Sequence, residues 1–551
     1  MLEESLGRGE RRATAIVLSV LFVEALWVFL HKYLPLDAAL WSLQADLVRA
    51  HISGNTGDAW RMIPIPAANV GVPLFTGLLD FLFSGEVVVR LLLAFVGIFA
   101  RGASVVLLFR VMRVRDEAVY YLIPVLAWSG LWFAGALPYL VGETVVFLTI
   151  AYFLTQQRPR AGAYGIILFG VGLAAFCHGL AWVTAALVII AVAREQRRSV
   201  HLSQGWLSSS RSVVLLTFPG LAIIALALFT AQPIFRVTTS NLLPSNGLGF
   251  LLFIATPVPT VLEGMLRGTD IFQIVISIAL LITLLGFFAR AFLLAMEEVT
   301  WQSRALRSAG FTLLLISLAG VYLKGFGLDT AALLGSSTLL ILAGAYSRGP
   351  AVRRTILDRL LLTIALTTMI VTGLFNAYSL NRGSDATTEV IKTARTLIRQ
   401  ERQSAKDDER IDSLRFSFVL DSSLAQLHAG YLVGTYSYSL AAPIYLFGAN
   451  DLLHDPTQFQ PAAGCIRPKE SALTRMSPTD PIALSSPEKY VDPHFRVLAL
   501  LPIGVSTSPT FGPYGFTLAD TNSSNFSRGL AEYRIAVGKL SPDHPTGLAS
   551  R

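Results

Sequence analysis

The chain has 551 residues, of which 53% are hydrophobic and 15% charged, and its formal net charge is +8. A soluble protein of this size would carry about 25% charged residues, so the composition excludes an ordinary soluble enzyme. Residues 381–551 hold equal numbers of basic and acidic side chains, which places the excess positive charge before residue 381. No aromatic–basic motif accompanies that charge, so nucleic acid is not an expected partner.

Apolar runs of membrane-spanning length recur before residue 380. About 20 apolar residues in a helix cross the ~30 Å hydrocarbon core of a bilayer. We therefore predict a polytopic α-helical membrane protein with about eleven transmembrane helices. The first run follows a basic start and lacks a clear cleavage site, which predicts an uncleaved first helix. The expected spans are 13–34, 91–111, 118–136, 138–155, 162–178, 180–194, 212–231, 270–289, 308–323, 329–346 and 357–378.

Arginine clusters between these spans predict the orientation. Cytoplasmic loops are enriched in Lys and Arg, and a cytoplasmic N-terminus with eleven spans puts every cluster inside. The clusters lie at 110–115, 158–160, 194–211, 304–307 and 348–359. The loop 35–86 and residues 381–551 are then expected on the outer face, most simply of a bacterial inner membrane.

Two apolar stretches are not predicted to be full membrane spans. Val70–Phe83 and Gly247–Leu266 are short or broken by Pro, Gly and acidic residues. Irregular backbone at membrane depth is tolerated where it lines a cavity or is buried in protein. We expect both stretches to be interfacial or re-entrant.

Residues 381–551 are expected to form a C-terminal extracytoplasmic domain of α+β or mostly β structure, separate from the membrane part at 1–380. Glu389–Gln403 has helical hydrophobic spacing, and the charged segment Lys406–Arg410 follows it as a hinge. Short β-like runs bounded by Pro, Ser, Asn and Gly come next. They are Phe416–Leu420, Tyr431–Tyr438, Ile444–Phe447, Val497–Pro502 and Tyr533–Val537.

Several segments appear in an order that resembles the GT-C class of membrane glycosyltransferases. The acid-bearing segment Leu34–His51 follows the first span, and a later span begins with Val87–Leu91. Trp132–Glu143 and Ala175–Leu180 then lie near the outer ends of spans, and a polar region closes the chain. The resemblance covers most of residues 1–380. The common first-loop pattern of the class has adjacent acids or an acid followed by His, whereas Asp37 has no acidic neighbour.

The resemblance implies transfer of a sugar from a polyprenyl-phosphate-linked donor. The acceptor would be a glycan, a lipid or a protein on the outer face, with membrane lipids around the site. A divalent cation, Mg²⁺ or Mn²⁺, is a candidate cofactor, because a cation held over the leaving phosphate stabilises its charge.

Asp37 is the first candidate catalytic residue, as a base for the acceptor hydroxyl or as a cation ligand. The alternative is that Asp37 only caps an interfacial helix that begins after Pro35. Asp46 is a candidate substrate-binding residue or else a solvated position on the same helix.

Glu143 and His178 are the other two candidate catalytic residues. Glu143 could be a second carboxylate for a metal or the acceptor, or it could cap a helix after Gly142. His178 could hydrogen-bond a phosphate or sugar, or it could be a packing residue at a helix end. Arg101 lies near mid-membrane, so we expect it to face a polar cavity or to pair with an acid.

Three basic residues on the predicted outer side are candidate substrate-binding groups. Arg236, Arg267 and Lys324 could neutralise the donor phosphate. The alternative for each is a side chain that extends to the lipid headgroups.

Two other function classes stay open. A carrier or flippase for a lipid-linked glycan would show two similar halves and a midplane site. A non-catalytic scaffold in envelope polysaccharide assembly would show no cavity near Asp37. ATP-driven transport is not expected, because the chain lacks a Walker A sequence.

Overall fold

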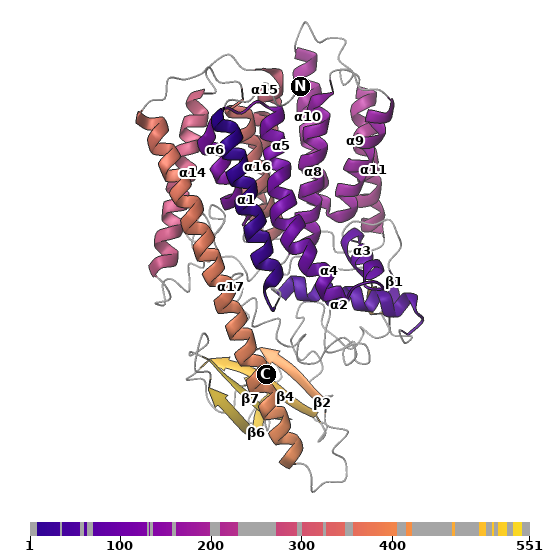
Figure 1. Ribbon diagram of the computed structural model, residues 1–551. Coiled ribbons are helices and arrows are strands. Elements are labelled where there is room, and N and C mark those ends of the chain that lie inside the picture. The colour runs from indigo at the N-terminus through magenta and orange to yellow at the C-terminus, as the bar shows by residue number, and fades with distance from the viewer. Residues whose placement is uncertain are drawn as a thin grey trace, which may run out of the picture.

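The protein forms a helical bundle with a β-sheet beyond one of its ends, as the computed structural model shows (Figure 1). The structure describes residues 8–33, 36–55, 60–62, 70–128, 132, 136–156, 161–198, 210–229, 271–294, 300–322, 327–347, 356–404, 415–420, 466–468, 495–502, 510–511, 516–525 and 533–542.

A helix lies over each of the eleven predicted spans. These helices are α1 (Arg8–Leu30), the continuous run α4 (Gly85–Leu91), η1 (Leu92–Ala100) and α5 (Arg101–Val111), α6 (Glu117–Ala127), α8 (Leu137–Thr155), α9 (Ala161–Cys177), α10 (Gly179–Arg198), α11 (Ser210–Phe229), α14 (Ile271–Leu294), α15 (Trp301–Tyr322), α16 (Gly327–Ala345) and α17 (Ile356–Ser404). The segment η1 is π-helical.

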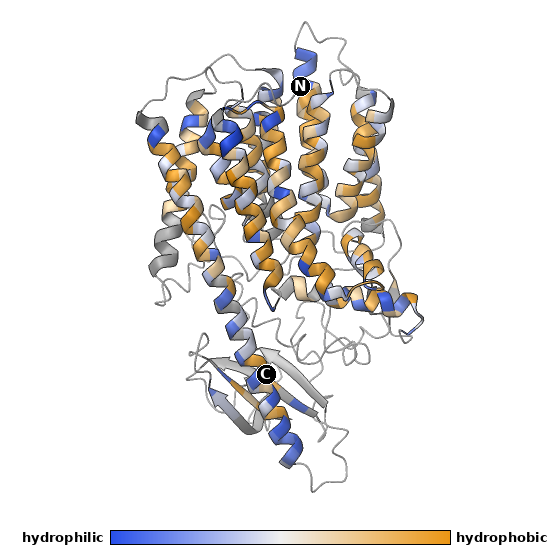
Figure 2. Ribbon diagram, viewed as in Figure 1, coloured by the Kyte–Doolittle hydropathy of each residue, from blue (hydrophilic) through white to orange (hydrophobic). Residues whose placement is uncertain are grey.

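The chain is an integral membrane protein. Five helices among the described residues are long and apolar enough to cross a bilayer: Gly9–Leu30, Gly85–Val111, Leu137–Thr155, Gly179–Arg198 and Arg359–Tyr378. Apolar residues cover the middle of the bundle, whereas hydrophilic residues gather at its ends (Figure 2). The number of eleven crossings stays a prediction.

Helix α6 ends earlier than the span predicted at 118–136. Its last helical residue is Ala127, and Trp128 takes an extended conformation. The Arg101 guanidinium donates to the Ala127 carbonyl at 2.9 Å, which satisfies a backbone acceptor that the ended helix leaves open. Eleven residues rise only about 16 Å, roughly half of a bilayer core.

The first loop lies across one end of the bundle (Figure 1). It contains α2 (Leu36–Ile52), strand β1 (Trp60–Met62) and the short helix α3 (Gly71–Leu79), before α4 begins. The interfacial or re-entrant segment predicted at Val70–Phe83 is this nine-residue helix and the turn after it. Its counterpart at Gly247–Leu266 lies outside the described residues.

Helix α17 runs without a break from the bundle to the sheet, so the expected boundary at 380/381 falls inside a helix. The helix predicted at Glu389–Gln403 is its final part. There, Val390, Ile391, Ala394 and Leu397 are buried. The hinge predicted at Lys406–Arg410 lies outside the described residues.

A five-stranded sheet follows α17, in the order β2-β4-β7-β6-β5. Only the β2–β4 pair is parallel. The strands are β2 (Arg415–Leu420), β4 (Phe495–Pro502), β5 (Thr510–Phe511), β6 (Phe516–Asn525) and β7 (Tyr533–Pro542). Three predicted strands therefore exist, at β2, β4 and β7. The strands predicted at Tyr431–Tyr438 and Ile444–Phe447 lie outside the described residues.

A short strand pair joins the first loop to the C-terminal part of the chain. Strand β1 pairs antiparallel with β3 (Ile466–Pro468), and Arg61 lies opposite Arg467. The sheet and the first loop also lie at the same end of the bundle (Figure 1). The sequence prediction that these two regions share one side of the membrane agrees with this arrangement.

A cysteine cross-link tests the pairing. In a Cys465→Ser background, the double substitution Arg61→Cys/Arg467→Cys should form a disulfide on mild oxidation, because opposed residues of antiparallel strands lie within disulfide reach. Mass spectrometry of the non-reduced digest would detect it. Arg113→Cys at the opposite end of the bundle, combined with Arg467→Cys, should not cross-link. Equal yields from the two pairs would contradict the strand pairing.

Candidate functional site

Helix α2 carries two of the predicted site residues on opposite faces. Asp37 and Asp46 are nine residues apart, or two and a half turns of a helix. They therefore cannot act as one pair of carboxylates. The side chain of Asp37 lies outside the described residues, so its catalytic or capping role stays a prediction.

Asp46 instead faces Asp80, which follows α3. The Asp80 side chain is buried and lies 3.1 Å from Arg49 Nε, while the Arg49 side chain is 47% exposed. Arg49 also approaches the Asp80 carbonyl at 3.5 Å. These three residues, the acid-pair site, bring two carboxyl groups and one guanidinium together at the end of the bundle.

Close packing of the helices α2, α3 and α4 brings these residues together. A Cβ on Gly85 would lie 2.8 Å from the Ala45 Cβ, and one on Gly77 would lie 2.4 Å from the Val48 Cβ. Only glycine at both positions lets α3 and α4 approach α2 this closely. The Ser84 hydroxyl caps α4 by accepting from the Val87 N–H at 3.4 Å.

The neighbours of Asp46 shift its acidity. Burial raises the pKa of Asp46 to about 6, and the charge of Asp80 adds to the rise. Arg49 acts in the opposite direction. A carboxyl group with such a pKa is mostly ionised at neutral pH, yet it takes up a proton more readily than an ordinary aspartate.

An apolar rim borders the acid-pair site. The exposed part of α3 and the turn after it carry five large apolar side chains, each about half exposed or more: Phe75, Leu78, Phe81, Leu82 and Phe83. At the end of a membrane bundle, such a surface is suited to contact with the lipid interface. The site therefore lies between lipid and the polar face of the protein.

A second polar cluster lies inside the bundle, around Glu143. Glu143 is 1% exposed, and its Oε2 lies 2.5 Å from Arg101 Nε. Ser336 on α16 donates to Glu143 Oε1 at 2.6 Å, and Ser336 Oγ lies 3.0 Å from the Tyr139 hydroxyl. Three helices thus meet through one ion pair. The pairing expected for Arg101 is present.

Glu143 therefore does not lie at a helix end or at the outer surface. It occupies the second turn of α8, paired and sealed from solvent. The geometry favours a structural role over the catalytic role that the sequence suggested.

His178 lies between α9 and α10. Its Nδ1 accepts the Leu180 backbone N–H at 3.2 Å, as a cap of α10. Its ring also meets the Tyr139 ring edge to face, with 5.4 Å between centroids. Both contacts match the packing alternative, and they place His178 beside the Glu143 cluster rather than at the acid-pair site.

Arg236, Arg267 and Lys324 lie outside the described residues, so their expected role toward a phosphate stays a prediction. The sequence reasoning missed Asp80 as a site residue and treated it only as an interruption of an apolar stretch. The signal that could have identified Asp80 is its position, as an acidic residue within the otherwise apolar segment 70–83.

Searches against protein-family models and against curated proteins find no match to this chain.

The acid-pair site predicts a pH effect on stability. The pKa of Asp46 is about 6 when folded and 3.8 ordinarily. Between these values the folded state binds more protons, so stability should fall as the pH rises from about 4 to about 6. Asp46→Asn cannot ionise and should flatten that part of the profile. Thermal unfolding midpoints of the wild type and of Asp46→Asn, measured in detergent between about pH 4 and about pH 6, test this prediction. The same pH dependence of the midpoint in the two proteins would contradict it.

The buried ion pair predicts a non-additive mutational series. Glu143→Leu or Arg101→Met should each destabilise the protein by about 3–5 kcal/mol, because each leaves an unpaired buried charge. The double variant should lose less than the sum of the two. Arg304→Met is a matched control, since Arg304 pairs with Glu195 at 3.0 Å but is 47% exposed. Glu195 keeps Arg198 as a second partner at 3.4 Å, so this variant should cost about 1 kcal/mol or less. Unfolding midpoints would measure all four.

Proposed function

We propose that the protein is a membrane glycosyltransferase of GT-C type. It would transfer a sugar from a polyprenyl-phosphate-linked donor to an acceptor glycan, lipid or protein on the outer face of a bacterial inner membrane. The observation that carries this proposal is the acid-pair site of Asp46, Asp80 and Arg49, which borders the apolar rim of α3.

Asp46 takes the role of general base. The acceptor hydroxyl oxygen attacks the anomeric carbon of the donor sugar, and the bond between that carbon and the phosphate oxygen breaks. Asp46 accepts the hydroxyl proton, and the polyprenyl phosphate leaves with the electron pair. A base with a pKa of about 6 is both ionised at neutral pH and basic enough to assist this transfer.

Asp80 and Arg49 adjust this base. The buried Asp80 carboxylate raises the proton affinity of Asp46, and the Arg49 guanidinium limits that rise. The exposed part of Arg49 also offers positive charge to a departing phosphate at the membrane surface. The apolar rim supplies a place for the first isoprenoid units of the donor.

The described side chains do not favour a protein-held divalent cation. Within the described part of the chain, no three of the Asp, Glu, His and Cys side chains gather at one point. Arg49 already neutralises Asp80 at 3.1 Å. No step is therefore assigned to Mg²⁺ or Mn²⁺.

The C-terminal sheet would be an extracytoplasmic acceptor-binding or gating module. Its support is the strand pair β1–β3, which ties residues next to α2 to the C-terminal part of the chain. An acceptor bound near the sheet would lie on the same side of the membrane as the acid-pair site. The orientation follows from the arginine clusters on the opposite side of the predicted spans.

Complementation of a deletion strain tests the function. Wild-type protein should restore the cell-envelope glycan profile, whereas Asp46→Asn should reduce the restored glycan by about 100-fold or more, as expected for loss of a general base. Asp80→Asn should reduce it less, since the base remains but its proton affinity changes. Composition and linkage analysis of the envelope glycans would measure both.

The matched control is Asp116→Asn, the same chemical change at the opposite end of the bundle. Asp116 caps α6 through the Ala118 N–H at 3.0 Å, and Asn is an equally good cap. The variant loses only the charge of a 3.7 Å contact with Arg290, far from the acid-pair site, so activity should persist. Membrane levels of all variants must match. An unaltered glycan profile in the deletion strain would defeat the proposal, and full activity of a folded Asp46→Asn variant would remove Asp46 as the base.

A further inference from the structure

A polar surface lies buried between α1, α6 and α17, in the membrane part of the chain. The buried face of α17 is apolar at first and then polar, at Thr372 and Asn376. Thr372 is 1% exposed and Asn376 is fully buried. The opposite face of α17 at this level is apolar and exposed, at Ile370, Val371 and Leu374. A helix with its polar side turned inward indicates a polar interior.

These inward polar groups have no hydrogen-bond partner. Both amide atoms of Asn376 and the Thr372 hydroxyl are buried and unsatisfied. A buried polar group without a partner is unfavourable, because it has lost its hydrogen bonds to water. Something beyond the described protein atoms must therefore bind them.

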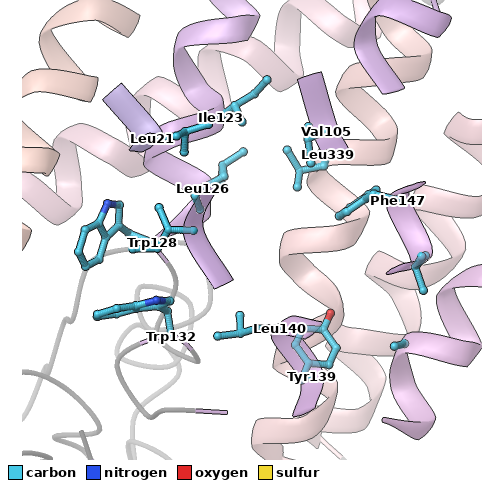
Figure 3. Packing of buried hydrophobic residues seen from close by; sticks show 14 of the residues in the cluster. Leu21, Val105, Ile123, Leu126, Trp128, Trp132, Tyr139, Leu140, Phe147 and Leu339 are labelled. Carbon is cyan, nitrogen blue, oxygen red and sulfur yellow. The ribbon is translucent and has the colours of Figure 1, made fainter. Parts of the chain in front are cut away.

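Glu24 on α1 faces the same helix. Its Oε1 lies 3.2 Å from the position that a Cβ on Gly373 would occupy, one residue after Thr372 and one turn before Asn376. Its Oε2 is buried without a hydrogen-bond partner. The Trp128 side chain, directly after the end of α6, lies beside Glu24. In Figure 3, Trp128 lies above Trp132 at that helix end.

No basic side chain among the described residues pairs with Glu24. Arg101 reaches the same end of α6, but it is engaged by Glu143 and by the Ala127 carbonyl. An unpaired carboxylate at this depth is strongly unfavourable. The missing positive charge must come from a bound cation or a proton.

Further polar groups lie between Glu24 and the end of the bundle. His31 follows the last residue of α1, seven residues and about 10 Å after Glu24. It lies beside Asn381 and near the exposed carboxylate of Asp385, both on α17. The ionisable groups around Glu24 are thus Arg101 and Glu143 toward the interior, and His31 and Asp385 toward the surface.

We propose that Glu24, Thr372 and Asn376 form an intramembrane site for a small monovalent cation, either a proton or Na⁺. The carboxylate supplies the charge, and the hydroxyl and amide supply neutral oxygen ligands or hold water around the proton. His31, Asn381 and Asp385 connect this site to the face that carries the first loop. The site is separate from Asp46 and does not depend on the glycosyl-transfer proposal.

Carbodiimide labelling of the full-length protein in liposomes tests the site. Dicyclohexylcarbodiimide is apolar and modifies protonated carboxyl groups, which mass spectrometry locates. Glu24 should be labelled, the labelling should decrease as the pH rises, and Glu24→Gln should abolish it. Glu143, buried but paired with Arg101, is the internal control and should stay unlabelled.

Two comparisons complete the test. At constant pH, slower labelling in NaCl than in choline chloride identifies Na⁺ as the ligand, and equal labelling identifies the proton. Asn376→Leu should move the pH midpoint of labelling upward, because replacing a polar group of the site with an apolar one disfavours the charged carboxylate. An unlabelled Glu24 at every pH at which the protein stays folded, equal labelling of Glu143, or an unmoved midpoint in Asn376→Leu would overturn the site.

Discussion

The Arg101–Glu143 ion pair holds the membrane part together at the point where α6 ends. The Arg101 guanidinium neutralises the Glu143 carboxylate on α8 and donates to the last carbonyl of α6, while Ser336 on α16 donates to the second carboxylate oxygen. In an apolar interior each of these groups alone would be unstable. Together they permit a helix of half the bilayer thickness to end among its neighbours.

That early end of α6 makes room for polar groups in the bundle. Trp128 follows the helix and contacts Glu24, while Thr372 and Asn376 on α17 turn toward the same region. Backbone that is not helical at membrane depth needs polar or buried surroundings. The polar interior and the short helix are therefore two consequences of one local arrangement.

The candidate site lies at one end of the bundle. One end carries α2, α3 and α4 with Asp46 and Asp80, and beyond it α17 continues into the sheet. The β1–β3 pair makes these segments one assembly although more than 400 residues separate them in sequence. A substrate at the acid-pair site would lie beside lipid and beside the C-terminal part of the chain.

The sequence by itself determined that the chain is an integral membrane protein and that a helix lies over each long apolar run, because such runs have few alternatives to a membrane helix. It did not determine where α6 ends or that α17 continues to the sheet. It also indicated that Arg101 faces a polar cavity or pairs with an acid. Only the tertiary structure shows that the acid paired with Arg101 is Glu143, and that Asp46 lies beside Asp80. Pairings between residues far apart in sequence depend on how the helices pack, and the hydrophobic pattern of the sequence does not predict these pairings.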